Sequence, residues 1–160
     1  MLDRVLPVAI HDLPAGTRFS LRTAEPASCA GTLPLPRRIG EVGEAEGYTV
    51  FCLGPDEWML IGAGEAAAPA APGCAVIDIS DREVAFALSG SGVMDAVAAG
   101  CPRDLRRFAP GTAVRTLYAG VDVIVWRQAA DRFEIHVWRS FAPFVRHRLE
   151  TVARELALGL

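Results

Sequence analysis

The residue types that could do acid–base, nucleophilic or metal chemistry are scattered along this chain. The three histidines, His11, His136 and His147, lack the HxH or HExxH spacing that brings two imidazoles onto one metal ion. Ser80 and Ser140 fit turn and helix-capping positions, and no GxSxG motif surrounds either hydroxyl. The glycine-rich stretches also lack the GxGxxG and Walker A patterns that hold phosphates. The sequence therefore predicts no catalytic residue and no metal ligand that a motif would reveal.

The four cysteines predict free thiols. They are Cys29, Cys52, Cys74 and Cys101. Neighbouring cysteines stand more than twenty residues apart, which excludes the close pairs of zinc sites and redox motifs. A chain of this size can bury a core without disulfides, and residues 1–11 lack the apolar region of a signal peptide. We therefore expect a cytoplasmic protein with four reduced thiols.

Length and composition predict a single globular domain over residues 1–160. Hydrophobic residues make up 51% of the chain and charged residues 22%, which is typical of globular proteins. No apolar run has the length that a membrane span needs. The formal net charge of −3 gives no basic footprint for nucleic acid, although all 16 basic residues are arginine. Neither nucleic acid nor a membrane is therefore expected as a partner.

Turn residues between β-rich runs predict two hairpins. In the first, strands over residues 48–53 and 58–61 flank a turn at 54–57. In the second, strands over residues 112–118 and 121–127 flank Ala119-Gly120. Further strands are expected over residues 16–22, 76–79, 84–88 and 132–138, and loops over 24–47 and the Ala/Pro-rich stretch 62–73.

Two amphipathic helices complete the predicted fold. The stretch 89–92 (SGSG) offers a side-chain oxygen to cap a short helix that Gly100 ends. Ser140 is expected to cap a longer final helix. The apolar face of that helix is predicted to consist of Phe141, Phe144, Val145, Leu149, Val152 and Leu156. Because strands and helices mix without repeated βαβ units, the fold class is α+β, with a mostly antiparallel sheet and two main helices.

Six short segments, taken together and in order, resemble the gamma subunit of heterotetrameric sarcosine oxidase. They more distantly resemble the folate-binding domain of the glycine cleavage T-protein, an aminomethyltransferase. The segments are residues 53–58 (LGPDEW), 78–82 (DISDR), 88–90 (LSG), 100–105 (GCPRDL), 110–111 (PG) and 139–142 (RSFA). Each segment alone is a common turn or cap, so the ordered set carries the resemblance. It implies the fold of that folate-binding domain, except that residues 62–73 replace an expected helix.

The resemblance implies a non-catalytic, structural subunit of a sarcosine oxidase complex that oxidatively demethylates sarcosine to glycine, within sarcosine catabolism and one-carbon metabolism. This chain would bind no cofactor itself. FAD, covalently bound FMN, NAD, zinc and tetrahydrofolate would belong to the other subunits. Its partners would be those subunits, chiefly the large flavoprotein and folate-binding subunit. Two alternatives are a free-standing folate-binding one-carbon protein related to aminomethyltransferases and a homo-oligomeric module with another partner.

Asp104 and Tyr118 are the candidates that the resemblance gives for a remnant folate site. Residues 104–111 (DLRRFAPG) align Asp104 with the catalytic aspartate of the T-protein, whose carboxylate could contact a tetrahydrofolate nitrogen. The residues themselves favour a different interpretation, because Asp104 stands in a loop that holds three arginines, Arg103, Arg106 and Arg107. This composition predicts a carboxylate held in surface ion pairs.

Tryptophan followed by arginine on two neighbouring predicted strands marks a candidate interface. The four residues are Trp126, Arg127, Trp138 and Arg139. Large aromatic side chains and arginine are enriched where proteins meet. Trp58, in the first predicted hairpin, is instead expected in the core.

Overall fold

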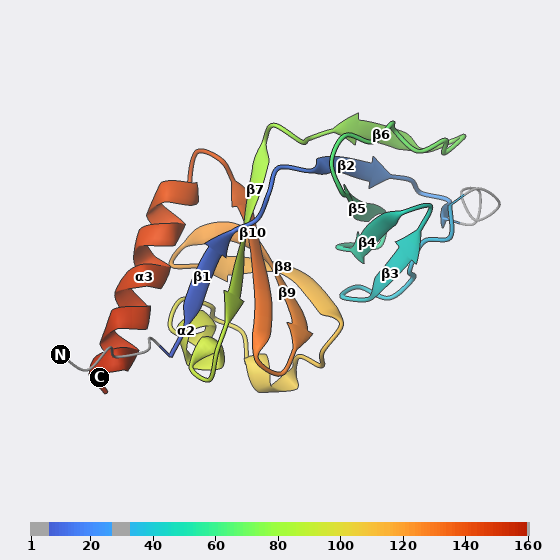
Figure 1. Ribbon diagram of the computed structural model, residues 1–160. Helices are drawn as coiled ribbons and strands as arrows, with labels where there is room; N and C mark the ends of the chain where they lie inside the picture. Colours follow the sequence, from blue (N-terminus) through green and yellow to red (C-terminus); the bar gives the residue numbers. More distant parts are fainter. Residues whose placement is uncertain (1–6, 27–32, 160) are drawn as a thin grey trace. The chain divides into compact units, whose positions relative to one another are not determined.

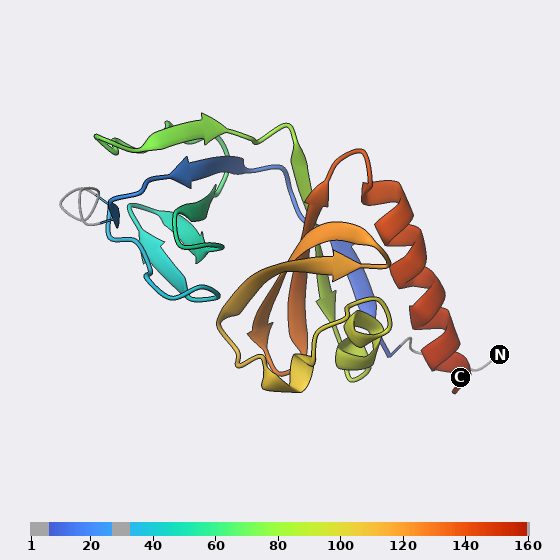
Figure 2. The same ribbon diagram turned by 180° about the vertical axis from the view of Figure 1, so that it is seen from behind.

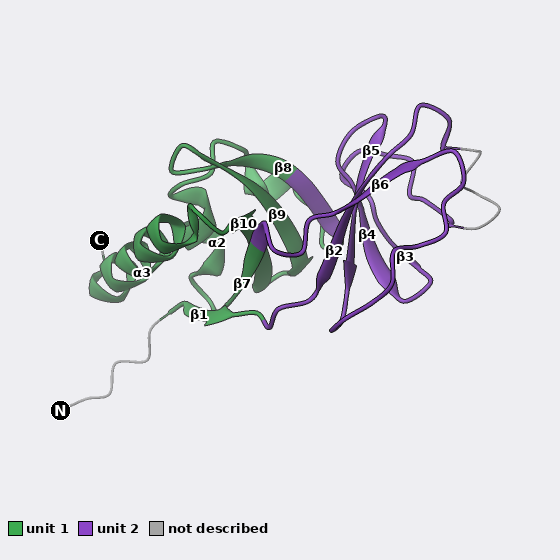
Figure 3. Cartoon of the chain, turned by 90° about the horizontal axis from the view of Figure 1, so that it is seen from above, with its two compact units in different colours: residues 1–13, 84–111, 115–160 green, residues 14–83, 112–114 purple. Residues whose placement is uncertain are grey.

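The computed structural model describes residues 7–26 and 33–159 (Figure 1). The chain divides into two compact units. Unit 1 comprises the described residues within 1–13, 84–111 and 115–160, and unit 2 those within 14–83 and 112–114 (Figure 3). The single domain expected over residues 1–160 stays a prediction.

Unit 2 is built around a five-stranded sheet with the order β3-β4-β5-β2-β6. Its strands are β2 (Thr17–Arg22), β3 (Val42–Ala45), β4 (Tyr48–Cys52), β5 (Glu57–Gly62) and β6 (Ala75–Asp78). All neighbouring strands pair antiparallel. Cys52 lies opposite Trp58, which confirms the first predicted hairpin. Trp58 is only 1% exposed, and its indole nitrogen donates to the Pro36 carbonyl at 2.7 Å, so it belongs to the core as expected.

Two segments of unit 2 bear on the predicted loops. Residues 24–47 were expected to be mainly loop, and strand β3 is an element within that stretch which was not predicted. This edge strand reads VGEA and lacks an alternating apolar pattern, so backbone pairing with β4 defines it rather than side-chain burial. Residues 63–73 contain neither helix nor strand.

Cys74 corrects the prediction of four reduced thiols. It is disulfide-bonded, whereas Cys52 and Cys101 are free and buried. Cys29 lies outside the described residues. The prediction was wrong for Cys74 because spacing along the chain does not measure the separation of Cα atoms that a disulfide requires.

A second five-stranded sheet supplies most of unit 1, with the order β1-β7-β10-β9-β8. Its strands are β1 (Ala9–Asp12), β7 (Glu83–Ser89), β8 (Thr112–Tyr118), β9 (Val121–Ala129) and β10 (Arg132–Trp138). Strands β8 and β9 are neighbours across Ala119 and Gly120, which confirms the second predicted hairpin. The φ angles of Ala119 and Gly120 are 50° and 85°, as the tight turn of a two-residue loop needs. Strand β1 was not predicted, because four residues give too short a pattern.

The helices of unit 1 are α2 (Val93–Ala98), the 3-10 helix η1 (Leu105–Arg107) and α3 (Ala142–Leu158). Helix α3 packs along β1 and β10 and against α2 (Figure 1 and Figure 2). In the described part of the chain, two α-helices and two mostly antiparallel sheets confirm the α+β class. None of the helices in the described part of the chain has the length and apolar character to cross a membrane.

Three details of the helices differ from the predictions. Neither α2 nor α3 has a side-chain cap, since Gly92 and Phe141 occupy the N-cap positions in place of the expected serines. The buried face of α3 consists of Val145, Leu149, Val152 and Ala153. Phe141 and Phe144 are each 47% exposed, because Phe141 precedes the helix and Phe144 flanks its buried stripe.

Gly100 lets the chain turn closely beneath an aromatic ring after α2. A Cβ atom at this position would lie 2.6 Å from the Tyr118 ring. The Gly100 carbonyl also accepts a hydrogen bond from the Ala119 amide at 2.9 Å. The end of α2 is therefore fixed against the β8–β9 turn by a contact that only glycine permits.

We predict that Gly100→Ala lowers the free energy of unfolding by about 1–3 kcal/mol, because the added methyl overpacks the Tyr118 ring. Gly43→Ala is the matched control, since its Cβ would meet Pro36 at an ordinary 3.6 Å. The control should change the free energy of unfolding by less than about 0.5 kcal/mol. Urea unfolding followed by tryptophan fluorescence measures both. Equal effects of the two substitutions would contradict the close contact.

Candidate functional site

Asp104 begins η1 and is held in place by a neighbouring arginine. Its Oδ1 accepts hydrogen bonds from the Arg106 backbone amide at 3.2 Å and from Arg106 Nε at 2.8 Å. Its Oδ2 accepts a third from Arg106 Nη2 at 3.2 Å. The Arg106 guanidinium therefore holds the pKa of the Asp104 carboxyl below its usual range. This is the arginine-paired surface carboxylate that the loop composition predicted, and its geometry favours the charged form over proton transfer.

Arg127 holds the same loop to strand β9. Its Nη1 donates to the carbonyls of Leu105, at 3.4 Å, and of Phe108. Its guanidinium also lies over the Phe133 ring, 5.6 Å from the ring centroid. The Leu105 carbonyl also accepts from the Phe108 amide at 3.1 Å, so Arg127 adds a second hydrogen bond there and one to the Phe108 carbonyl, which is a structural task within the chain.

Tyr118 lies in the core at the end of β8. It is 1% exposed, and its hydroxyl donates to the Ala96 carbonyl in α2 at 3.1 Å. Burial raises the pKa of Tyr118 to about 12. The phenol therefore links β8 to α2, and it has no open path to a ligand.

A shallow pocket of about 310 Å³ lies near these two candidates. It is lined by uncharged residues that include Cys101, Pro102 and Leu117. Neither Asp104 nor Tyr118 lines it. This pocket therefore does not bring the two predicted folate residues together.

The histidines and acidic residues do not gather into a metal site in the described part of the chain. No group of three or more His, Cys, Asp or Glu side chains there could hold an ion. His136 is 2% exposed, and its Nε2 lies 3.2 Å from Glu134 Oε2. Glu134 in turn accepts a hydrogen bond from Gln128 at 2.7 Å. His136 is thus a buried residue of the sheet.

The two tryptophans of the predicted interface lie on the same face of neighbouring strands. Trp126 is opposite Glu134, and Trp138 follows Glu134 by four residues, so strand alternation puts both rings on one face. Trp138 is 46% exposed, and Arg139 follows it in an exposed turn. Trp126 is only partly exposed. A partner contact through these four residues stays a prediction.

The structure adds two exposed aromatic residues that sequence reasoning assigned to the buried face of α3. Phe141 and Phe144 follow Trp138 closely in the chain, and the Phe141 amide donates to the Trp138 carbonyl at 2.9 Å. We call Trp138, Phe141 and Phe144 the aromatic patch. The three residues lie within positions 138–144 and each is about half exposed, and exposed apolar side chains that gather in this way mark interaction surfaces more often than scattered single residues do. The helical pattern alone could not find the patch, because it does not show where the helix begins.

Comparison with known proteins identifies the chain's relatives, although no protein-family model matches it. It is 36% identical to sarcosine oxidase subunit gamma from Arthrobacter sp. over 167 residues, covering 94% of this chain and 82% of the relative. It is 34% identical to the subunit of the same name from Corynebacterium sp. (strain P-1), covering 82% and 69%. The chain belongs to the sarcosine oxidase gamma subunit family. The resemblance drawn from the sequence is therefore confirmed.

Solved structures agree with this assignment. A chain of the heterotetrameric sarcosine oxidase from Corynebacterium sp. U-96, in complex with pyrrole 2-carboxylate, is 27% identical with a TM-score of 0.83. The match covers 94% of this chain and 85% of that chain. The glycine cleavage aminomethyltransferase T from Bartonella henselae is 16% identical with a TM-score of 0.68, covering 89% and 45%. The second likeness confirms the aminomethyltransferase-like fold and carries no argument about activity.

The enclosure of Tyr118 predicts a distinctive alkaline titration. Since the phenol of the folded chain ionises near pH 12 and that of the unfolded chain near pH 10, the folded state retains its proton longer. The contribution of the buried, protonated phenol to the free energy of unfolding is thus complete below about pH 10, and it is lost as the pH rises toward 12. Absorbance of the phenolate near 295 nm should show one tyrosine ionising only near pH 12, and Tyr118→Phe should remove that step. A step near pH 10 assigned to Tyr118 would show that the ring is accessible.

Proposed function

We propose that this chain is a structural subunit of a sarcosine oxidase complex that oxidatively demethylates sarcosine to glycine, and that it contributes no catalytic group. The observation that carries the proposal is its identity of 30–36% with three proteins named sarcosine oxidase subunit gamma. The proposal keeps the cytoplasmic location expected from the sequence.

The state of the candidate side chains supports the non-catalytic part of the proposal. The Asp104 carboxylate accepts three hydrogen bonds from Arg106, and the Tyr118 hydroxyl is engaged with Ala96. Both polar groups therefore already have partners within this chain, which supports a structural role for each of them. The chemistry of FAD, FMN, NAD, zinc and tetrahydrofolate therefore falls to the other subunits in this proposal.

The chief partner in this proposal is the large flavoprotein and folate-binding subunit. The aromatic patch supports a partner contact of some kind, because it leaves three large apolar side chains in solvent. The candidate interface of Trp126, Arg127, Trp138 and Arg139 overlaps the patch at Trp138. The partner therefore has at least one apolar region of this chain to cover.

Affinity purification of the tagged chain from its host tests the assignment to a complex. We expect a flavoprotein to co-purify under low-salt conditions, and the chain purified alone to be colourless. Mass spectrometry identifies the bound proteins, and absorbance near 450 nm reports flavin. Recovery of no flavoprotein, or stoichiometric flavin on the isolated chain, would contradict the proposal.

The substitution Asp104→Ala tests whether this chain supplies a catalytic group. We expect sarcosine turnover by the assembled complex to stay within a few fold of wild type, with and without tetrahydrofolate. Asp95→Ala, at another exposed aspartate of unit 1, is the matched control. Loss of a proton-transfer group typically costs about a hundredfold or more in rate. A loss of that size in folded, assembled Asp104→Ala, confined to the folate-dependent reaction, would instead support a folate-binding role.

A further inference from the structure

Strand β1 leaves a row of backbone hydrogen-bonding groups on the outer edge of its sheet. It is the terminal strand in the order β1-β7-β10-β9-β8, and no strand in the described part of the chain pairs with its other edge. The Leu13 amide donates to the Ala85 carbonyl at 2.9 Å, in the register that places His11 opposite Ala87. Odd-numbered residues of β1 therefore direct their N–H and C=O groups toward β7. The N–H and C=O groups of Ile10 and Asp12 point to the free edge.

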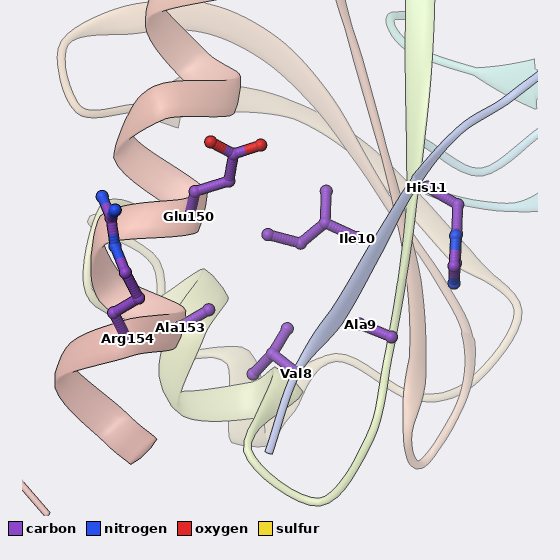
Figure 4. Close-up of a pocket in the computed structure, with 7 residues that line it drawn as sticks. All are labelled: Val8, Ala9, Ile10, His11, Glu150, Ala153 and Arg154. Atoms are coloured by element: carbon purple, nitrogen blue, oxygen red, sulfur yellow. The ribbon is translucent and has the colours of Figure 1, made fainter. Parts of the chain in front are cut away.

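A groove of about 590 Å³ runs along this free edge. One wall is formed by four consecutive residues, Val8 to His11, and the other by Glu150, Ala153 and Arg154 of α3. Figure 4 shows Val8 and Ile10 directed toward α3 and Ala9 and His11 directed away from it. Because residues pointing to both faces of the strand line the groove, it follows the backbone edge as well as the apolar side chains.

The groove combines an apolar floor with a charged rim. Val8 and Ala153 are 1% and 2% exposed, so the floor is part of the core surface. Glu150 accepts a hydrogen bond from Arg146 Nε at 2.8 Å, and Arg146 also binds Asp12, so one guanidinium is shared by two carboxylates and the three groups carry a net charge of −1. Arg154 donates to the Thr151 hydroxyl at 3.3 Å and pairs with no carboxylate in the described residues. Arg154 is therefore the cation of the rim that remains available to an acidic group, since both carboxylates of the rim are already held by Arg146.

We propose that this groove binds an extended segment of another subunit of the complex, which adds to the sheet as a sixth strand beside β1. The proposal rests on the proposed function, because it requires a complex. The added strand pairs its backbone with Ile10 and Asp12, places apolar side chains at alternate positions over Val8 and Ile10, and sets an acidic side chain against Arg154. Strand addition at a sheet edge beside a helix is a recurring mode of peptide recognition.

The charges favour a segment of a different chain over a second copy of this one. The only carboxylate on β1 is Asp12, and Arg146 of the same chain already binds it. A second copy that paired through β1 would therefore bring no available carboxylate to Arg154. A different subunit is free to supply one, and the similar structure from Corynebacterium sp. U-96 is described as heterotetrameric.

Hydrogen exchange on the assembled complex tests the pairing directly. In the isolated chain, the amides of Ile10 and Asp12 should exchange quickly, whereas those of Ala9 and His11 are already bonded to β7. On assembly with the other subunits, exchange at Ile10 and Asp12 should slow at least tenfold. Unchanged exchange at both amides in an intact complex would overturn the strand addition and leave the subunit assignment standing. Failure of the wild-type chain to assemble would contradict the proposed function itself.

Variants of the groove separate the backbone contact from the side-chain contact. Ile10→Ala removes the apolar side chain and keeps the amide, whereas Ile10→Pro also removes the outward N–H without breaking a bond to β7. We expect Ile10→Pro to weaken association at least tenfold more than Ile10→Ala. Thermal unfolding of each isolated variant shows whether it is folded. If Ile10→Pro does not fold, the hydrogen-exchange experiment decides whether the added segment pairs with the backbone of β1. Equal association of folded Ile10→Pro and Ile10→Ala would contradict the backbone pairing.

Charge reversal tests the identity of the occupant. Arg154→Glu should weaken association with the other subunits at least tenfold, while Arg148→Glu, at an exposed position of the same helix outside the groove, should stay within twofold. If Arg154→Glu and Arg148→Glu weakened association equally, the loss would reflect only the overall charge of the chain and would contradict an acidic occupant. A homodimer of the isolated chain that Ile10→Pro abolishes would assign the groove to a second copy and overturn the proposal.

Discussion

The antiparallel pairing of β1 with β7 is the constraint on which the arrangement of unit 1 depends. It adds residues 9–12 to a sheet whose other strands lie between residues 83 and 138. It also directs the side chains of Ile10 and Asp12 toward α3. Arg146 of that helix binds Asp12 and Glu150 and lies over the Phe86 ring, 5.9 Å from its centroid. One arginine thereby joins two strands to the helix, and the pairing leaves the far edge of β1 available.

The residues that looked most capable of chemistry are used to hold the fold together. Asp104 caps η1 and binds Arg106, while Arg127 binds the Leu105 and Phe108 carbonyls of the same loop. Tyr118 ties β8 to α2 through the Ala96 carbonyl. A fold shared with an aminomethyltransferase therefore carries, in this chain, side chains whose polar groups are satisfied internally. This agrees with a role in assembly, which depends on surfaces rather than on reactive groups.

The parts of the fold that the sequence predicted are those that local interactions determine. The two hairpins follow from turn residues between apolar runs, and the pairing of Asp104 with arginine follows from neighbours two residues away. Strand β3 and strand β1 escaped prediction because they are short edge strands whose existence depends on a partner strand. The disulfide at Cys74 and the exposure of Phe141 and Phe144 escaped for a related reason. The disulfide depends on where distant segments come together, and the exposure of the two phenylalanines depends on where α3 begins, neither of which spacing along the chain encodes.

The groove beside β1 could not be predicted for the same reason, since it joins residues 8–11 to residues 150–154 across most of the chain length. Its recognition required the hydrogen-bond register of β1, which shows that the backbone N–H and C=O groups of Ile10 and Asp12 point away from β7. The aromatic patch similarly became visible only when the first residue of α3 was fixed. Both candidate surfaces therefore come from the folded structure, whereas the resemblance to the family was already visible in short sequence segments.

The central claim is that this chain contributes assembly and no chemistry, and omitting the chain tests it most directly. The complex should be purified with and without this subunit, and its flavin content, sarcosine turnover per flavin and thermal unfolding measured. The account predicts that flavin and turnover per flavin stay within a few fold in whatever assembly persists, while unfolding occurs at a lower temperature. An intact, flavin-loaded assembly whose turnover falls a hundredfold or more without this chain would contradict the account.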